Sequence, residues 1–122
     1  MKKINWRDCS KYFIHADAIE YAMIGNKNKK YNLGPKTPGI ECAEGISFFN
    51  HAELQPHKKL DQHVGKYEEI YYILQGEGEF YVDGEYEKVT SGDAIYVPPG
   101  SIHGMNNKSN RKIEYICLGS TS

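Results

Sequence analysis

The chain has 122 residues, 39% of them hydrophobic and 12% aromatic, which suits one domain with its own core and leaves little room for a second. Its 15 lysines and arginines nearly balance its 16 aspartates and glutamates, so no bulk charge draws it to nucleic acid or to an anionic membrane. It shows no apolar run of membrane-spanning length and no signal peptide, and its three widely spaced cysteines form no disulfide framework, so we expect a cytoplasmic protein.

The first 45 residues give the weakest structural signals. Residues 17–24 fit either a short strand or a helical turn, and their periodicity does not decide between the two. Residues 25–39 hold several lysines and two glycine-proline pairs, which predict a solvated surface loop. We expect residues 1–45 to form an N-terminal segment that packs on the main domain.

From residue 46 to residue 118, short apolar runs alternate with turn residues. The candidate strands are 46–54, 69–74, 79–82, 85–89, 94–97 and 113–118. Asp83-Gly84 is the strongest hairpin signal in the chain, and it joins two of these strands. Short strands at regular intervals predict an all-β protein, an antiparallel sandwich or barrel over 46–118 with a tail at 119–122. The turn residues that favour positive φ are Gly76, Gly84, Gly92 and Gly100.

Strand alternation places one carboxylate inside the predicted barrel. Glu69, Tyr71 and Ile73 share one face of their strand, and the residues between them share the other. A buried carboxylate is costly unless it is paired, hydrogen-bonded or bound to a metal. His63 lies just before this strand, and His103 follows the sharp turn after another strand. Two imidazoles and one carboxylate at the rim of a barrel would form a facial triad suited to Fe(II) or another divalent ion.

The spacing of these residues resembles two motifs of the cupin family, which are small jelly-roll barrels. The first motif is represented by His63, by Glu69 after the expected gap, and by Gly76 six residues later. The second motif is glycine, five residues, Pro-x-Gly, two residues, histidine, three residues and asparagine. It is matched at every position, by Gly92, Pro98, Gly100, His103 and Asn107.

This resemblance implies a single antiparallel jelly-roll barrel with an N-terminal extension and one divalent metal ion (Fe, Mn, Ni, Zn or Co). Carried over residue by residue, it implies the metal ligands His63, Glu69 and His103. Gly65 stands where the family has a second histidine, and His57 stands where the first motif opens with glycine. His57 and Gln62 are the candidate replacement ligands, although His57 lies among lysines and Gln62 would face away from His63 in a regular strand.

Other side chains have weaker functional interpretations. His51 and Tyr71 are the candidate acid-base groups, and Tyr71 is also expected to be a pocket wall because it shares a face with Glu69. For His51, exposure to solvent is the alternative. His15 has no evident partner, and Cys117 is expected to be a small buried residue near the end of the last strand.

Members of the family include dioxygenases, sugar and sugar-acid isomerases, lyases and decarboxylases, so the resemblance implies a scaffold and leaves the reaction open. It is compatible with a metalloenzyme that acts on a small oxygen-rich molecule such as a sugar, a sugar acid or a carboxylate. The alternative is a non-catalytic ligand-binding or sensor module with a degenerate metal site. The outward face of Ile70, Tyr72 and Leu74 permits a homodimer.

Overall fold

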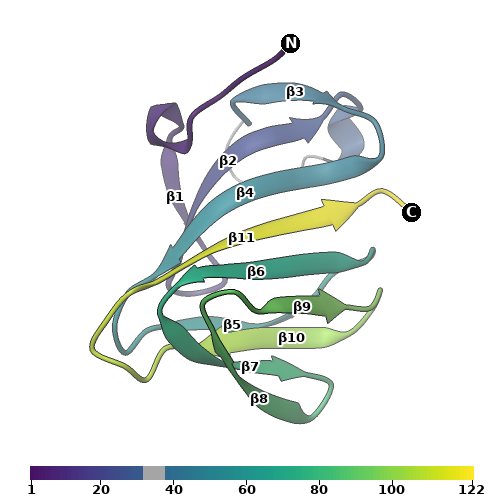
Figure 1. The fold of residues 1–122 in the computed structure, drawn as a ribbon. Coiled ribbons are helices and arrows are strands. Elements are labelled where there is room, and N and C mark those ends of the chain that lie inside the picture. The colour runs from purple at the N-terminus through teal and green to yellow at the C-terminus, as the bar shows by residue number, and fades with distance from the viewer. Residues whose placement is uncertain (32–37) are drawn as a thin grey trace.

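The computed structural model describes residues 1–31 and 38–122, which form two facing β-sheets in a jelly-roll arrangement (Figure 1). The larger sheet has the strand order β1-β2-β4-β11-β6-β9, with β3 paired to β2, and the smaller has the order β5-β10-β7-β8. Every strand pair is antiparallel except β2–β3. The predicted all-β fold is therefore confirmed, and no helix of the described residues has the length and apolarity to cross a membrane.

The strand bounds can be given in chain order. They are β1 Lys11–Ile14, β2 Ala18–Asn26, β3 Ile40–Ala43, β4 Ile46–Leu54, β5 Lys59–Val64, β6 Glu69–Gln75, β7 Glu77–Val82, β8 Glu85–Thr90, β9 Ala94–Val97, β10 Ile102–Asn106 and β11 Ile113–Ser120. Two 3-10 turns, η1 Trp6–Asp8 and η2 Lys29–Tyr31, complete the described elements.

The ambiguous segment near residue 20 is a strand. Residues 18–26 form β2, which pairs with β4 and so extends the larger sheet. Gly25 and Asn26, predicted to begin a loop, are the last residues of that strand. The rest of the predicted loop contains η2 and the segment 32–37, which lies outside the described residues.

The Asp83-Gly84 hairpin is confirmed. Val82 and Glu85 are paired across the turn, and the two residues between them have φ of 44° and 91°. Two positive φ values define the turn that matches the right-handed twist of paired strands, and Gly84 adopts its value without a steric penalty.

Strands β5 and β10 were not predicted, and they change the setting of both candidate histidines. His63 lies in β5 and His103 in β10, where the two residues are directly paired. Strand β5 buries only Leu60, so its sequence lacks the alternating apolar pattern that marks a half-buried strand.

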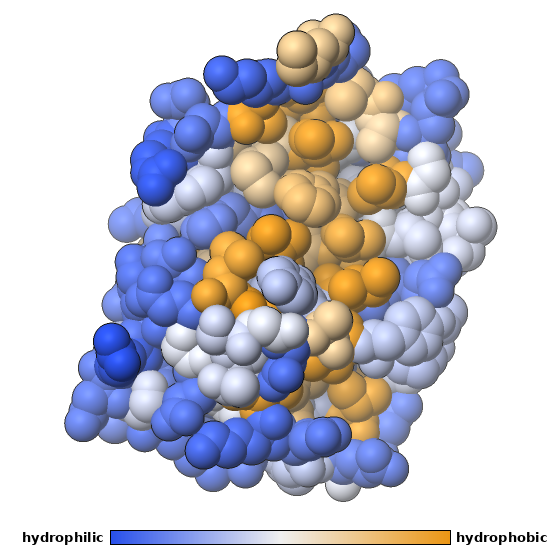
Figure 2. Space-filling model, viewed as in Figure 1, coloured by the Kyte–Doolittle hydropathy of each residue, from blue (hydrophilic) through white to orange (hydrophobic). Residues whose placement is uncertain are grey.

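The core lies between the two sheets. Tyr71, Ile73 and Phe80 are buried there, and the shared inward face of Tyr71 and Ile73 is the one that strand alternation predicted. On the outer face of β6, Ile70, Tyr72 and Leu74 are about 40% exposed in the single chain. Figure 2 shows apolar residues gathered in a band along one face of the molecule, with hydrophilic residues on both sides.

Candidate metal centre

Three predicted residues from different strands come together inside the barrel. His63 and His103 are cross-strand partners in the smaller sheet, with ring centroids 4.2 Å apart. Glu69 is the first residue of β6 in the larger sheet. One ligand atom from each of the three side chains lies within 4.8 Å of the other two. The junction of the two sheets thus places two imidazoles and a carboxylate around one point.

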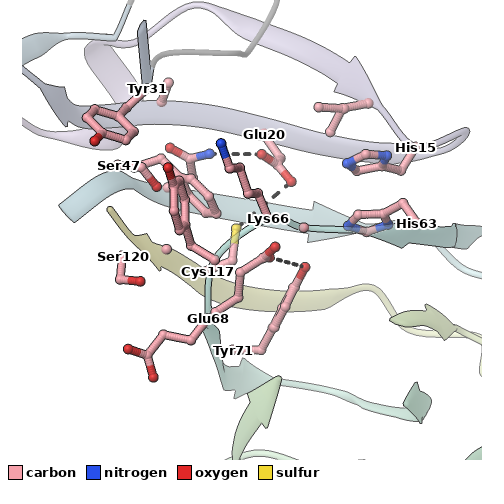
Figure 3. A pocket seen from close by; sticks show the side chains of 18 of the residues that line it. His15, Glu20, Tyr31, Ser47, His63, Lys66, Glu68, Tyr71, Cys117 and Ser120 are labelled. Atoms are coloured by element: carbon pink, nitrogen blue, oxygen red, sulfur yellow. Dashed lines mark hydrogen bonds between the residues drawn. The ribbon is translucent and has the colours of Figure 1, made fainter. Parts of the chain in front are cut away.

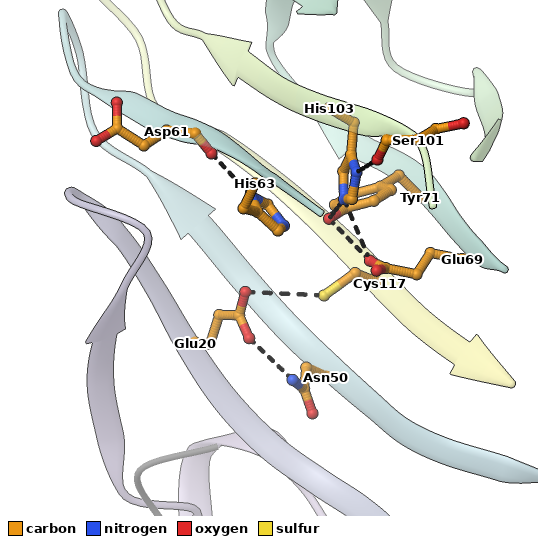
Figure 4. A network of polar contacts seen from close by, with 9 residues as sticks. All are labelled: Glu20, Asn50, Asp61, His63, Glu69, Tyr71, Ser101, His103 and Cys117. Atoms are coloured by element: carbon orange, nitrogen blue, oxygen red, sulfur yellow. Dashed lines mark hydrogen bonds and ion pairs between the residues drawn. The ribbon is translucent and has the colours of Figure 1, made fainter. Parts of the chain in front are cut away.

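Backbone carbonyls fix the tautomer of both histidines. The Nδ1–H of His63 donates to the carbonyl of Asp61 at 2.7 Å, and the Nδ1–H of His103 donates to the carbonyl of Ser101 at 3.0 Å (Figure 4). Because a carbonyl oxygen only accepts, the proton must be on Nδ1 in each ring. Each Nε2 is then the atom left for a ligand bond, as in metal sites where a second hydrogen bond orients the imidazole.

The two imidazoles differ in their electrostatic surroundings. Burial lowers the pKa of His63 to about 4, so this ring is neutral at physiological pH. Burial also opposes the charging of His103, but its contact with Glu69, 3.4 Å from Nε2 to Oε1, and its hydrogen bond to the Ser101 carbonyl together outweigh burial and raise the pKa of His103. A cation placed among the three side chains would take over the favourable interaction with the carboxylate that His103 now makes.

Tyr71 completes the cluster and lies where strand alternation predicted. It is buried, it lines the pocket, and its hydroxyl donates to Glu69 Oε1 at 3.2 Å and lies 3.2 Å from His103 Nε2. Burial, together with the nearby carboxylate, raises the pKa of Tyr71 well above its usual value. The phenol therefore stays protonated and holds Glu69 in place by donating a hydrogen bond.

Gly65 lies against the carboxylate of Glu69. A Cβ atom at position 65 would overlap Glu69 Oε2, so any side chain there must displace the carboxylate from its present position. The space that the family's second histidine would need is occupied here by Glu69. The donor set that remains, two imidazole nitrogens and a carboxylate, suits a divalent transition metal with further positions left for water or ligand.

His15 is a member of the site that sequence reasoning missed. Its ring stacks on that of His63, with centroids 3.5 Å apart and planes 6° from parallel. Burial lowers the pKa of His15, so no charge repulsion opposes the stack. The nitrogen lone pairs of stacked rings lie in separate parallel planes, so one ion cannot lie in both. His15 therefore supports His63 rather than replacing the absent ligand.

The fold explains why His15 gave no signal. It belongs to the turn between β1 and β2, with φ of 50°, and its carbonyl accepts a hydrogen bond from the Asp61 amide of β5 at 2.8 Å. This contact joins residues far apart in the chain.

The two candidate replacement ligands lie elsewhere: His57 is exposed and contacts Asn110, and Gln62 is exposed and does not line this pocket.

His51 was predicted to be either an acid-base group or a solvent-exposed residue, and the structure supports neither prediction. It is buried rather than exposed, it does not line the pocket, and its ring stacks on Trp6 at 4.2 Å. His51, Glu53 and Glu114 do offer three ligand atoms within 4.8 Å of one another. The ammonium of Lys112, however, lies 2.9 Å from Glu114 and 3.8 Å from Glu53, so a cation already offsets part of the charge of these carboxylates.

A pocket of about 470 Å³ opens beside the candidate metal centre (Figure 3). His63, Glu69 and Tyr71 line one part of it, and Lys30 and Lys66 contribute positive charge to its lining. Cys117 is buried, as predicted, and also lines the pocket. The volume lies within the range of sites for small molecules, about 300–1,000 Å³.

Comparisons with known proteins agree with this fold. The Cupin domain family matches residues 50–119, more than half of the chain. The oxalate-binding protein of Thermotoga maritima is 36% identical over 59 residues, which are 48% of this chain and 48% of that protein. The chain spans about half the length of the curated relatives it matches.

Two solved structures show the same fold. The crystal structure of a predicted oxalate decarboxylase from Thermotoga maritima has a TM-score of 0.75 at 19% identity and covers 96% of each chain. The polyketide cyclase RemF from Streptomyces resistomycificus has a TM-score of 0.76 at 18% identity, covering 100% of this chain and 80% of that chain. With the family match, the two-sheet fold and the convergent histidines and glutamate, this chain belongs to the cupin family.

Proposed function

We propose that this protein binds one divalent metal ion through His63, Glu69 and His103 and uses it to hold and transform a small oxygen-rich acid. The observation that carries the proposal is the convergence of three ligand atoms within 4.8 Å of one another, two of them on His63 and Glu69, which line a small-molecule pocket. A divalent ion there would act as a Lewis acid toward carboxylate, carbonyl or hydroxyl oxygens.

Charge in the pocket supports an anionic ligand. Two neutral imidazoles and one carboxylate leave a divalent ion with net positive charge. Elsewhere in the lining, Lys30 and Lys66 are matched in number by Glu20 and Glu68, so the ion would be the main source of positive potential. Tyr31 and Tyr67, whose ring centroids lie 5.8 Å apart, line the same pocket and restrict its width. The name of the oxalate-binding relative agrees with a small carboxylate at such a site.

The protein's own groups would orient the ligand and keep the site preorganised. Tyr71 holds the Glu69 carboxylate, and carbonyls of β5 and the β9–β10 turn hold the two rings, so little has to rearrange when a metal binds. The tightly packed core behind Tyr71 excludes water from that side. Which reaction follows, an isomerisation, an elimination or, with O₂ as a second substrate, an oxygenation, depends on the ligand.

A second candidate function is ligand binding without turnover. The oxalate-binding relative favours it, because that protein's name describes binding alone. Turnover of a ligand that binds with the metal present would favour the enzyme, and tight binding with no chemical change would favour the module.

The experiment is metal analysis of protein purified without chelators. We expect about one divalent ion per chain in the parent and its loss in His63→Ala, Glu69→Gln and His103→Ala, since three-ligand sites tolerate the loss of a ligand poorly. His57→Ala is the matched control, because His57 is an exposed histidine away from the pocket. A parent that takes up no metal, or variants that keep it, would contradict the proposal.

We also propose a cytoplasmic homodimer. Ile70, Tyr72 and Leu74 expose an apolar face on β6 that a second copy would cover. Light scattering should give twice the chain mass, and Tyr72→Glu should halve it. A monomeric parent protein would overturn the proposed homodimer.

A further inference from the structure

A second buried carboxylate lines the pocket without belonging to the metal centre. Glu20, in β2, is 7% exposed and is one of the pocket-lining residues. Its Oε1 accepts hydrogen bonds from Asn50 Nδ2 at 2.9 Å and from the Tyr12 hydroxyl at 3.2 Å. Among the described residues, no lysine, arginine or histidine pairs with it. Burial raises the pKa of Glu20, and the hydrogen bonds from Asn50 and Tyr12 oppose that rise only in part.

The hydrogen-bonding capacity around Glu20 is incompletely used. An ionised carboxylate oxygen has about two acceptor positions, and those of Oε1 are taken by Asn50 and Tyr12. Oε2 receives only the Cys117 thiol, a weak donor, at 3.9 Å. Asn50 also lines the pocket, is 4% exposed, and its Oδ1 is buried with no hydrogen-bond partner. Two neighbouring acceptors on pocket-lining residues therefore lack a strong donor.

The amide of Asn50 cannot be turned to remove this deficit. Its Nδ2 donates to Glu20 and lies 3.4 Å from the Tyr12 oxygen, so a flipped amide would set Oδ1 against a carboxylate. Unsatisfied buried acceptors cost free energy, and their retention beside a pocket points to a missing partner that supplies donors.

These acceptors lie near the metal centre. Cys117 in β11 is the direct strand partner of Asn50 on one side and of Tyr71 on the other. Its side chain lies between the carboxylates of Glu20 and Glu69 (Figure 4). A ligand of several carbon atoms that is held at the metal centre can therefore extend to Glu20 and Asn50.

We propose that Glu20 and Asn50 form a hydroxyl-binding subsite, so that the ligand is a polyhydroxy acid whose acidic end lies at the metal and whose hydroxyls donate to Glu20 Oε2 and Asn50 Oδ1. This inference rests on the proposed function. A second carboxylate at the subsite would be repelled by Glu20. An ammonium group would be opposed by the metal and by Lys30 and Lys66, whereas hydroxyls supply donors without charge.

The test compares two acids that chelate a metal in the same way. Glycolate and gluconate share an α-hydroxy carboxylate, and only gluconate carries further hydroxyls. With the full chain loaded with Mn²⁺, calorimetry should show gluconate binding at least about tenfold more tightly than glycolate, a difference of about 1.4 kcal/mol. Glu20→Gln replaces one carboxylate oxygen with an amide group, which donates hydrogen bonds instead of accepting them. In this variant the ratio of gluconate affinity to glycolate affinity should fall to about threefold or less, while the glycolate affinity stays unchanged.

Glu68→Gln is the matched control, because Glu68 also lines the pocket but already accepts a hydrogen bond from Tyr96 at 2.9 Å. It should keep the full ratio. Equal affinities of the two acids in the parent, or an unchanged ratio in Glu20→Gln, would overturn the subsite, and the parent measurement holds even if that variant does not fold. Tighter binding of γ-aminobutyrate than of gluconate would also overturn it. Failure of both acids to bind Mn²⁺-loaded protein would instead count against the proposed function.

Discussion

The contact between Gly65 and Glu69 allows metal affinity to be changed by a single added methyl group. In Gly65→Ala, the new Cβ would overlap Glu69 Oε2, so the carboxylate must rotate away. It would then lose its hydrogen bond from Tyr71 and its place beside His103. The backbone amide and carbonyl of residue 65 are unaffected, so the hydrogen bond from the Gly100 amide at 2.9 Å is kept.

The expected loss of metal affinity is larger than the expected change in stability. Displacing or misorienting a ligand costs about 10- to 100-fold in metal affinity, or about 1.4–2.8 kcal/mol. Gly65 does not have a positive φ, so alanine is compatible with its backbone. Such a replacement stabilises a fold by about 0.4–1 kcal/mol through the unfolded chain, which offsets the loss of about 1 kcal/mol expected from breaking the Tyr71–Glu69 hydrogen bond. Loss of affinity with no loss of stability would therefore identify a direct effect on the site.

The assay is a titration of metal-free protein with Zn²⁺ against a competing chelator, together with thermal unfolding of the metal-free forms. Gly45→Ala is the control, because a Cβ at position 45 meets no atom within 4 Å. We expect its affinity to equal that of the parent. If Gly65→Ala also bound Zn²⁺ as tightly as the parent, Glu69 would not be a ligand in the position seen here.

Three further predictions follow from the histidines. His15→Ala removes the ring that stacks on His63 and should weaken Zn²⁺ binding by about 3- to 10-fold in the same titration, a smaller effect than the loss of a metal ligand. An unchanged Zn²⁺ affinity would refute a supporting role for His15. Because the folded-state pKa of His63 lies near 4, below its unfolded value, its stabilising effect is complete above about pH 6.5 and is lost as the pH falls toward 4. The metal-free parent should lose free energy of unfolding over that window, and His63→Ala should lose less, by chemical denaturation. His51→Ala should destabilise the fold by roughly 1–2 kcal/mol through lost packing on Trp6, while metal content stays at the parent level; loss of the metal would place His51 in the site.

Sequence reasoning succeeded where local chemistry determines the structure. The Asp83-Gly84 turn requires two positive φ values, and the alternation along β6 follows from strand geometry, so the hairpin and the inward direction of Glu69 and Tyr71 were predictable. Motif spacing predicted that His63 and His103 lie close together, but it did not predict that they are paired across two strands. Neither β5 nor β10 has an apolar pattern that identifies a strand.

The parts that were missed depend on contacts between distant segments. His15 reaches His63 only because the β1–β2 turn is hydrogen-bonded to β5, and Glu20 faces the pocket only because β2 pairs with β4. His51 was misplaced because alternation along β4 does not reveal which face is covered by Trp6. Long-range pairing of this kind has no signature in a local window of the chain.

The central claim is that one divalent ion binds at Nε2 of His63, Nε2 of His103 and the Glu69 carboxylate. Anomalous diffraction from crystals soaked in Zn²⁺ tests it most directly. The account predicts one strong peak about 2.0–2.2 Å from each of these three groups, with both Nδ1 atoms still donating to carbonyls. A peak bonded to either Nδ1 atom, or one found instead among His51, Glu53 and Glu114, would contradict it.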